Sequence, residues 1–268
     1  MEVQPILSRI TIYPVKSLDG IALQKAVVTK GGCLLHDREY AITDTDGNPI
    51  IGKTNPLVHS LRSSIDFEKD EISFRRREET TWRRFHLQKE RPKIESYLTE
   101  FFGTPSVLHQ DTQGRFMDIP DIAGVTVLST GSLKTVSGWF NNLDLEETRK
   151  RFRATIEIDG VPPFWEDRLF SKDGTTIEFK IGEVILFGMS PRERCVVPTR
   201  HPESGEILHA FPKTFARHRA ASLPEWSLLT EYRNHYYLSV NCYIPETEIG
   251  KWIHLGDEIK IIGEKNFQ

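Results

Sequence analysis

The stretch TTIEFKIGEVILFGMS, residues 175–190, decides the fold class of this chain. It places two runs of β-branched and apolar residues on either side of a Gly-Glu pair, which predicts a β-hairpin. The same arrangement returns in IGKWIHLGDEIKIIG, residues 249–263, around a Gly-Asp pair. We therefore expect antiparallel strands of a compact barrel in the second half of the chain.

The first third of the chain carries further strand signals. EYAITDTDGNPIIG, residues 39–52, has an Asp-Gly dipeptide between apolar stretches, which is the pattern of a hairpin turn. Residues 59–77 predict two strands around a charged turn, and residues 81–88 predict another strand. This part of the chain is therefore expected to be built mainly from short strands.

Two helices interrupt the strand pattern. In residues 91–104, Ile94, Tyr97, Leu98 and Phe101 recur at the spacing of one helical face. A proline near the start and a glycine just past the end mark the limits of this helix. In VTVLSTGSLKTVSGWFNN, residues 125–142, a strand runs directly into a short helix whose cap is Ser129 or Thr130.

Strands do not alternate regularly with long helices, which argues against a doubly wound parallel sheet. The sequence instead predicts a mainly β (α+β) fold with two β-barrel-like modules and a few short helices. The expected boundary lies in the loop near residue 122, which gives an N-terminal β-barrel module at 1–122 and a second module at 123–268.

Composition excludes several classes of protein. The 268 residues carry a formal net charge of −3, which argues against a dedicated nucleic-acid-binding protein. No apolar run approaches the roughly 18 residues that span a bilayer, and the N-terminus lacks the pattern of a secretory signal. Three cysteines are too few for a disulfide scaffold. We expect a cytoplasmic protein with no nucleic-acid or membrane partner.

Two N-terminal turns combine groups that suit an anion. In YPVKSLDG, residues 13–20, a strand ends in Lys16 and Ser17 before a glycine, so a cation, a hydroxyl and backbone donors come together. In HDREY, residues 36–40, Arg38 follows an aspartate. That neighbour pair is either a surface ion pair or a device that holds the arginine toward a site, and the local sequence leaves both interpretations open.

Two later segments also suit an anion. VLSTGSLK, residues 127–134, runs from a strand through small hydroxyl residues into a helix N-terminus, where free N–H groups favour negative charge; an ordinary helix cap is the alternative. In RFRATIEIDG, strand alternation would send Arg151 and Arg153 to one face and Phe152 to the other. Two arginines on one face bind phosphate or carboxylate, or form a solvated basic surface.

SPRERCVVPTRHPESGE, residues 190–206, poses the main chemical question through Cys195. Arg192 and Arg194 favour its thiolate, which is the form that acts as a nucleophile or as a soft-metal ligand. A small core residue and a redox-active thiol are the other interpretations. No compact histidine or cysteine pair accompanies His201 and His209, so a zinc site is not expected.

The segments together resemble a known family. The motifs that carry the resemblance are YPVKSLDG, HDREY, RFRATIEIDG followed by FWED, RCVVPTRHPESG, and GKWIHLGDEIKII. They occur in the order and spacing of MOSC proteins, named for the C-terminal domain of molybdenum cofactor sulfurase. The first 120 or so residues resemble the β-barrel module that precedes the MOSC domain in many members. By architecture, the chain is similar to the amidoxime-reducing components and their bacterial counterparts.

The resemblance implies a molybdenum cofactor (Mo-molybdopterin) between the two modules. Cys195 would bind molybdenum directly and would thus be both the metal ligand and the catalytic residue, beside Arg194 of the same motif. The matching cofactor contacts, to phosphate and pterin, are Lys16, Ser17 and Arg38 from the first module and Ser129, Thr130, Ser132 and Arg153 from the second. The family also carries an expectation of pyridoxal phosphate binding.

Three positions depart from the family pattern. Many relatives read P-C-x-R-C where this chain has Arg192, and Thr155 and His201 replace an asparagine and an aspartate. No C-x4-C-x2-C iron–sulfur pattern is present. Electrons are therefore expected from a separate protein, either ferredoxin-like or a flavin/haem reductase.

The resulting expectation is an oxidoreductase that reduces small N-hydroxylated compounds, namely hydroxylamines and amidoximes. One alternative is a molybdenum cofactor or sulfur carrier in which Cys195 holds a persulfide. Another is a binding module that has lost its cofactor. His201 is a candidate proton source because an unperturbed imidazole titrates near neutral pH.

Overall fold

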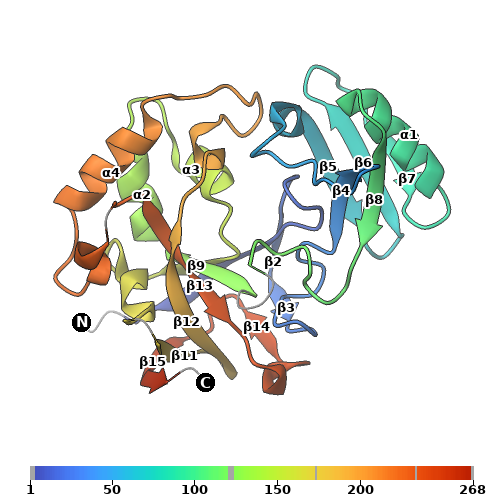
Figure 1. The fold of residues 1–268 in the computed structure, drawn as a ribbon. Coiled ribbons are helices and arrows are strands. Elements are labelled where there is room, and N and C mark those ends of the chain that lie inside the picture. The colour runs from blue at the N-terminus through green and yellow to red at the C-terminus, as the bar shows by residue number, and fades with distance from the viewer. Residues whose placement is uncertain (1–3, 120–123, 173, 233, 267–268) are drawn as a thin grey trace.

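The structure is a computed structural model that describes residues 4–119, 124–172, 174–232 and 234–266. Its largest element within these ranges is an eight-stranded sheet in the order β15-β11-β12-β13-β9-β10-β1-β2 (Figure 1). These strands are β1 (Ile6–Ile12), β2 (Ile21–Leu23), β9 (Val125–Ser129), β10 (Ile156–Asp159), β11 (Thr175–Ile181), β12 (Val184–Glu193), β13 (Tyr237–Tyr243) and β15 (Ile259–Asn266).

The hairpin predicted at 175–190 is confirmed. Strands β11 and β12 pair antiparallel from Ile181↔Val184 to Ile177↔Gly188. Gly182 in the turn has φ +56°, a left-handed conformation that favours glycine. The turn residues and the strand pattern therefore agree with one another.

The hairpin predicted around Gly256 and Asp257 is wrong. The chain does turn there, with the Asp257 carboxylate accepting the His254 N–H at 2.7 Å. The two arms pair elsewhere, however: β14 (Trp252–His254) pairs with β3 (Lys25–Val27), and β15 pairs with β11. Long-range partners thus took precedence over the local pairing that the turn residues suggested.

A second body lies beside the large sheet and contains α1 (Arg91–Phe102) at the right of Figure 1. Its strands are β4 (Tyr40–Asp44), β5 (Leu61–Asp66), β6 (Glu71–Arg76), β7 (Arg83–His86) and β8 (Ser106–Gln110). β5, β6 and β7 form the antiparallel set predicted from residues 59–88, whereas β4 pairs with β8. After the Asp-Gly turn at 46–47 only a single bridge, Thr43↔Pro49, returns to β4.

The helix predicted at 91–104 is confirmed as α1, and Gly103 ends it with φ 67°. Ile94, Tyr97 and Leu98 are buried as expected. At the last turn Phe102 is buried, while Phe101 is only partly buried and packs against the same core. The apolar face is therefore shifted by one residue at its C-terminal end.

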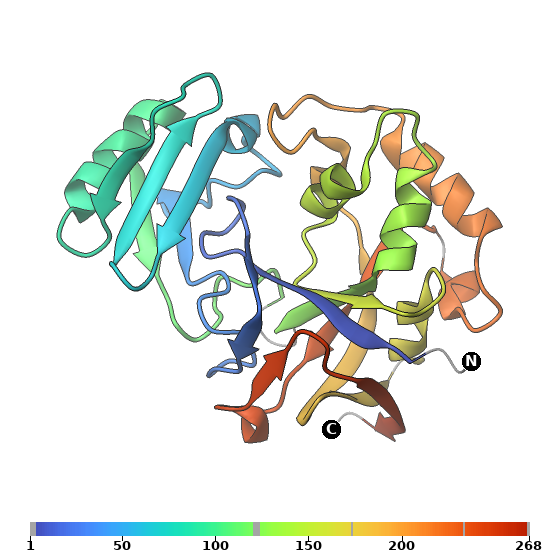
Figure 2. The same cartoon turned by 180° about the vertical axis from the view of Figure 1, so that it is seen from behind.

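The other helices belong to the layer on the large sheet, seen from behind in Figure 2. They are α2 (Thr130–Ser137), α3 (Leu145–Phe152) and α4 (Phe211–Ala221). Ser129 caps α2 by accepting the Ser132 N–H at 3.1 Å. Between β9 and β10 the chain runs through α2 and α3, so these two strands pair parallel.

The strand expected from RFRATIEIDG begins only at Ile156, so the alternation predicted for Arg151, Phe152 and Arg153 is wrong. Arg151 and Phe152 end helix α3, and Arg153 is its C-cap with φ 53°. Asp144 accepts the Glu147 N–H at 2.7 Å and starts the helix. Acidic residues in the first turn and basic ones in the last also favour a helix.

The mainly β (α+β) fold with a few short helices is confirmed. The sheet does not close into a barrel within the described residues: its pairing ends at β15 and β2. Only a bridge between Ile6 and Glu258 connects β1 to the start of β15. The expected boundary at residue 122 lies outside the described residues. The pairing crosses that boundary, because β1 and β2 join strands from the second half of the chain.

We predict that Gly188→Ala destabilises the fold strongly. A Cβ atom at this buried position of β12 would lie 1.5 Å from the Leu169 carbonyl oxygen, so the strand that leads to Cys195 would have to shift. We expect a loss of about 1–3 kcal/mol or more in the free energy of unfolding, measured by urea denaturation. Gly138→Ala is the control, because its Cβ would meet only ordinary contacts of 3.5 Å; equal stability of the two variants would contradict the close approach.

Candidate functional site

Three segments meet where the second body adjoins the large sheet. The turn after β1 contacts the 34–39 turn, since the Tyr13 carbonyl accepts the Arg38 N–H at 2.9 Å. Arg38 also donates to Thr155 Oγ1 at 3.2 Å, at the start of β10. Arg153 donates to the Leu18 carbonyl at 2.7 Å. The structure therefore brings Lys16, Ser17, Arg38 and Arg153 to one place.

Two arginines enclose the Tyr13 ring. The guanidinium of Arg153 lies 4.0 Å from the ring centroid and that of Arg38 lies 4.5 Å from it. Burial and the neighbouring Arg38 charge lower the pKa of Arg153. Asp37 offsets part of this repulsion: its carboxylate is buried, accepts from Arg38 at 2.5 and 2.6 Å, and accepts the Tyr13 N–H at 2.8 Å. Of the two interpretations of the Asp-Arg pair, the structure matches the one that holds Arg38 inward.

Several of these residues have left-handed backbone conformations. Ser17 has φ 71°, Arg38 has φ 52° and Arg153 has φ 53°. Such angles cost non-glycine residues free energy and are enriched at functional sites. Three of the candidate residues at this junction therefore have a strained backbone.

Asp118 is the carboxylate that meets the cations at the outer side of the junction. Its Oδ1 lies 3.6 Å from Lys16 Nζ, and its Oδ2 accepts from Arg192. Removal from water alone would raise the pKa of Asp118, but Arg192, Arg38, Lys16 and Arg194 lower it to about 2. We call Lys16, Arg38, Arg192 and Arg194 the cation cluster.

Arg194 and Cys195 follow directly after β12. Arg194 donates to the Phe152 carbonyl at 2.9 Å, yet its Nε and Nη1 are buried without a hydrogen-bond partner among the described residues. Burial and Arg192 lower the pKa of Arg194 to about 10. Cys195 is exposed, whereas Cys33 and Cys242 are buried. The interpretation of Cys195 as a core residue is therefore excluded.

The three hydroxyl residues of VLSTGSLK are engaged inside the second half of the chain. Ser132 donates to Glu166 at 2.9 Å and accepts the Phe164 N–H at 2.6 Å. Thr130 donates to Glu157 at 2.8 Å. These contacts match the helix-cap interpretation, and the assignment of Ser129, Thr130 and Ser132 to the cofactor remains a prediction.

The two remaining departures from the family pattern are also placed. Thr155 accepts from Arg38 and is buried. His201 Nδ1 accepts the N–H groups of Glu203 and Ser204 at 3.2 and 3.3 Å. Its Nε2 lies 4.0 Å from a Glu147 oxygen. The proton-source role of His201 remains a prediction and would have to use Nε2.

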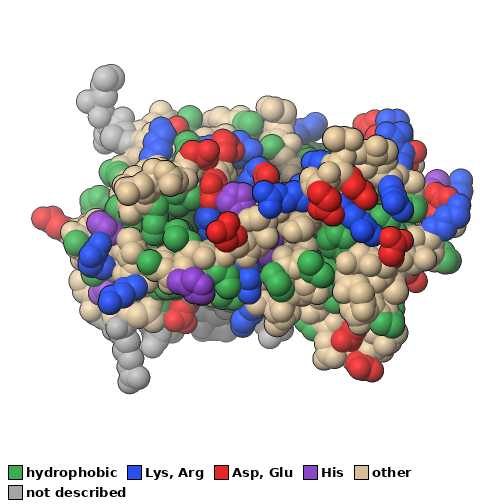
Figure 3. Space-filling view, turned by 90° about the horizontal axis from the view of Figure 1, so that it is seen from above, with side chains coloured by type: hydrophobic (Ala, Val, Ile, Leu, Met, Phe, Trp, Pro, Cys, Tyr) green, Lys and Arg blue, Asp and Glu red, His purple; other side chains and the backbone are tan. Residues whose placement is uncertain are grey.

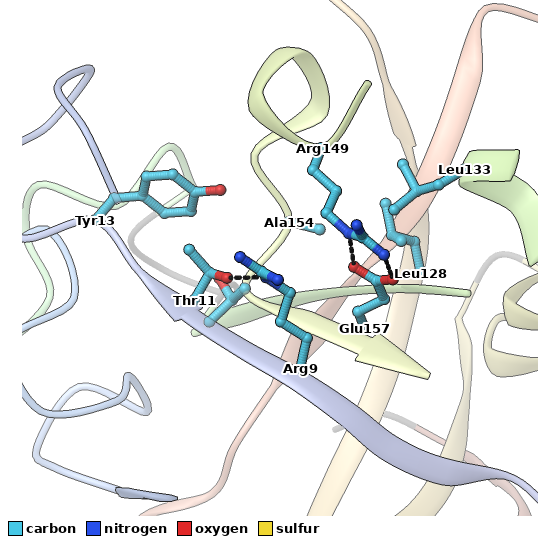
Figure 4. A pocket seen from close by; sticks show the side chains of 9 residues that line it. Arg9, Thr11, Tyr13, Leu128, Leu133, Arg149, Ala154 and Glu157 are labelled. Carbon is cyan, nitrogen blue, oxygen red and sulfur yellow. Dashed lines mark hydrogen bonds and ion pairs between the residues drawn. The ribbon is translucent and has the colours of Figure 1, made fainter. Parts of the chain in front are cut away.

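A small pocket adjoins the junction on the side of β1 and β10 (Figure 4). It has an empty volume of about 280 Å³ and is lined by Arg9, Thr11, Tyr13, Leu128, Leu133, Arg149, Ala154, Thr155 and Glu157. Arg149 is neutralised there by Glu157 at 2.7 Å, and Arg9 donates to Thr11 at 3.4 Å. Tyr13 and Asp118 were not among the predicted residues, although the motif YPVKS contains Tyr13, and Asp37 was considered only as the neighbour of Arg38.

Within the described part of the chain, no group of three or more His, Cys, Asp or Glu side chains is arranged to hold a metal ion. No helix in the same residues is long and apolar enough to cross a membrane. On the face shown in Figure 3, Lys and Arg side chains are mixed with Asp and Glu.

Residues 4–105 match the family model described as the MOSC N-terminal beta barrel domain. Over 94% of its length, the chain is 22% identical to a molybdenum cofactor sulfurase of Oryza sativa subsp. japonica, of which the match covers 35%. The chain is also 23% identical to a molybdenum cofactor sulfurase of Solanum lycopersicum, and this match covers 97% of the chain and 36% of that protein. The chain thus spans about a third of the length of these curated relatives.

These comparisons agree with the resemblance to MOSC proteins. The relatives' names do not mention pyridoxal phosphate or reduction of N-hydroxylated compounds. Because the match covers a minor part of each relative, what the whole relatives do is not transferred to this chain.

We predict that Glu166→Gln changes the pH dependence of stability. Burial and the neighbouring Asp167 raise the pKa of Glu166 to about 7, so the folded protein retains a proton that the unfolded chain releases from about pH 4.5 upward. Wild-type stability should fall by roughly 1–3 kcal/mol between pH 4.5 and 7 through this group and then level off. Denaturation at several pH values should show the variant gaining on wild type in that window, whereas parallel curves would contradict the assignment.

Proposed function

We propose that this chain binds molybdenum cofactor at the junction, with Cys195 as a ligand of the metal, and reduces N-hydroxylated compounds by two electrons. The observation that carries the proposal is an exposed thiol directly after Arg194, whose two buried nitrogens lack partners. Buried donors without partners are costly and normally find one. An anionic ligand beside Cys195 would provide it.

The chemistry of the donors fits this cofactor. A thiolate suits a soft, redox-active metal such as molybdenum. The cation cluster and Arg153 suit a phosphate, because guanidinium and ammonium groups form charge-assisted hydrogen bonds with it. Lys16 Nζ, Arg38 and Arg153 would hold the phosphate and pterin end, and Arg194 would lie nearer the metal.

When bound, the cofactor would supply a metal centre that accepts an oxygen atom and exchanges two electrons. The overall conversion is R–NHOH + 2e⁻ + 2H⁺ → R–NH2 + H2O. Cys195 would fix the metal at the end of β12, and the left-handed turns at Ser17 and Arg38 would orient the anionic end. His201 Nε2, near Glu147, would carry a proton. A ferredoxin-like protein or a flavin/haem reductase would supply the electrons.

A second candidate is a carrier of sulfur or of the cofactor, with Cys195 holding a persulfide. Two observations favour it: Cys195 is exposed, and the named relatives are molybdenum cofactor sulfurases. Both candidates use the same residue, so they differ in whether the loaded protein turns over a substrate.

Cys195→Ser is expected to lose bound molybdenum while the fold remains intact, because a hydroxyl of nearly the same volume is a poor soft-metal ligand. The measurement is metal analysis of protein purified from a host that makes the cofactor. Cys33→Ser is the matched control and should retain the metal, since Cys33 is buried beside Thr29 and Lys30. Equal molybdenum in both variants would remove Cys195 from the metal site.

The reaction is tested on molybdenum-loaded protein reduced with dithionite and a viologen. We expect benzamidoxime to yield benzamidine, and a hydroxylaminopurine to yield the aminopurine. Confirmed molybdenum occupancy without product would reject the reductase function and leave the carrier as the better candidate. Detection of a persulfide on Cys195 by mass spectrometry would then support the carrier.

A further inference from the structure

Asp118 occupies the position that an anionic ligand of the cation cluster would take. Its carboxylate contacts Lys16 and Arg192 directly. Arg38 already pairs with Asp37. Among the described residues, only Asp118 places a carboxylate in an ion pair with Lys16 or Arg192.

The backbone holds Asp118 beside the cluster. Asp111 Oδ1 accepts the N–H groups of Gln113 and Arg115, which fixes a turn, and the Met117 N–H donates to the Gly114 carbonyl at 3.1 Å. The side chain of Met117, which directly precedes Asp118, is buried. Asp118 therefore follows an anchored residue. Its carboxylate is held at the cation cluster by the chain itself, whereas a ligand must reach the cluster from solution.

The Asp118 carboxylate is accessible to water. The Asp118 side chain is 56% exposed, so water can replace the cluster as its partner at small cost. The cluster residues are less exposed, at 23% for Lys16 and 19% for Arg192. If the contact is lost, water can therefore replace the partner of Asp118 more easily than it can replace the partner of Lys16 and Arg192.

We propose that Asp118 is an internal competitor that neutralises the cation cluster and is displaced when an anionic ligand binds. The proposal rests on the proposed function only for the identity of that ligand as a phosphate-bearing cofactor. Ligand binding then exchanges one anion for another, and the affinity of the site for phosphate is lowered by the contact that Asp118 makes.

Arg192 supplies a guanidinium that holds the Asp118 carboxylate directly. Here Arg192 is itself positioned by Asn241, whose Oδ1 accepts from it at 2.8 Å. The guanidinium is thereby directed toward Asp118 rather than into solvent.

The experiment is titration calorimetry of the purified full chain, free of cofactor, with inorganic phosphate. Asp118→Asn preserves the shape of the side chain and removes its charge, so phosphate should bind about tenfold to a hundredfold more tightly, the effect of one charge-assisted contact. Asp46→Asn is the matched control: it removes one charge from the exposed Asp-Gly turn and should leave phosphate affinity within about twofold, because distant exposed charges are screened.

Three further measurements make the result decisive. Asp118→Glu keeps the carboxylate and should bind phosphate within a few-fold of wild type. Lys16→Ala, combined with Asp118→Asn, should abolish most of the gain, which places the phosphate in the cluster. Without phosphate, Asp118→Asn should unfold at a lower temperature than wild type, and phosphate should raise its melting temperature more than that of wild type.

Unchanged or weaker phosphate binding in Asp118→Asn would overturn the proposal, since Asp118 would then support the site rather than compete for it. Absence of phosphate binding in every variant would overturn it as well. Both results are distinguishable from failure of the proposed function. That function is tested separately, by whether Cys33→Ser retains molybdenum and Cys195→Ser loses it.

Discussion

The buried pair of Asp37 and Arg38 is the interaction on which the candidate site depends. Asp37 accepts the Tyr13 N–H and two bonds from Arg38. Arg38 in turn reaches Thr155 at the start of β10. One carboxylate thus fixes the turn after β1 against the second half of the chain. Breaking a buried ion pair typically costs 3–5 kcal/mol, so the position of Lys16 and Ser17 depends on Asp37.

This arrangement concentrates positive charge. Arg38 and Arg153 both face the Tyr13 ring, and Arg192 and Arg194 follow one another closely at the end of β12. The π face of Tyr13 stabilises two of these cations, but it carries no net charge. Asp37 and Asp118 are too few carboxylates to neutralise the set. The proposed anionic ligand would relieve this repulsion, which is already present before the ligand binds.

Local signals in the sequence predicted most of the secondary structure, and non-local pairing accounts for most of the errors. The β11–β12 hairpin and α1 follow from turn residues and periodicity. The partner of β14 is β3, more than two hundred residues earlier in the chain, and no turn rule can indicate such a pairing. By contrast, α3 had a readable signal that was missed: Asp144 followed by Glu147 is the spacing of a helix N-cap.

The site itself was predictable only in its parts. Motif chemistry identified Lys16, Ser17, Arg38 and Arg153, and the fold brings these four together at the junction. Motif chemistry could not identify Asp118, because a carboxylate in a charged loop has no distinguishing pattern in the sequence until the positions of the surrounding cations are known. The unpartnered nitrogens of Arg194 are likewise invisible in sequence. Each such buried donor costs roughly 1–3 kcal/mol, a sizeable part of an ordinary stability of 5–15 kcal/mol. Arg219, whose Nη2 pairs with Asp167, has the same two nitrogens unpartnered, so this feature alone does not mark a ligand site. At Arg194 it supports the proposed ligand because an exposed Cys195 follows directly.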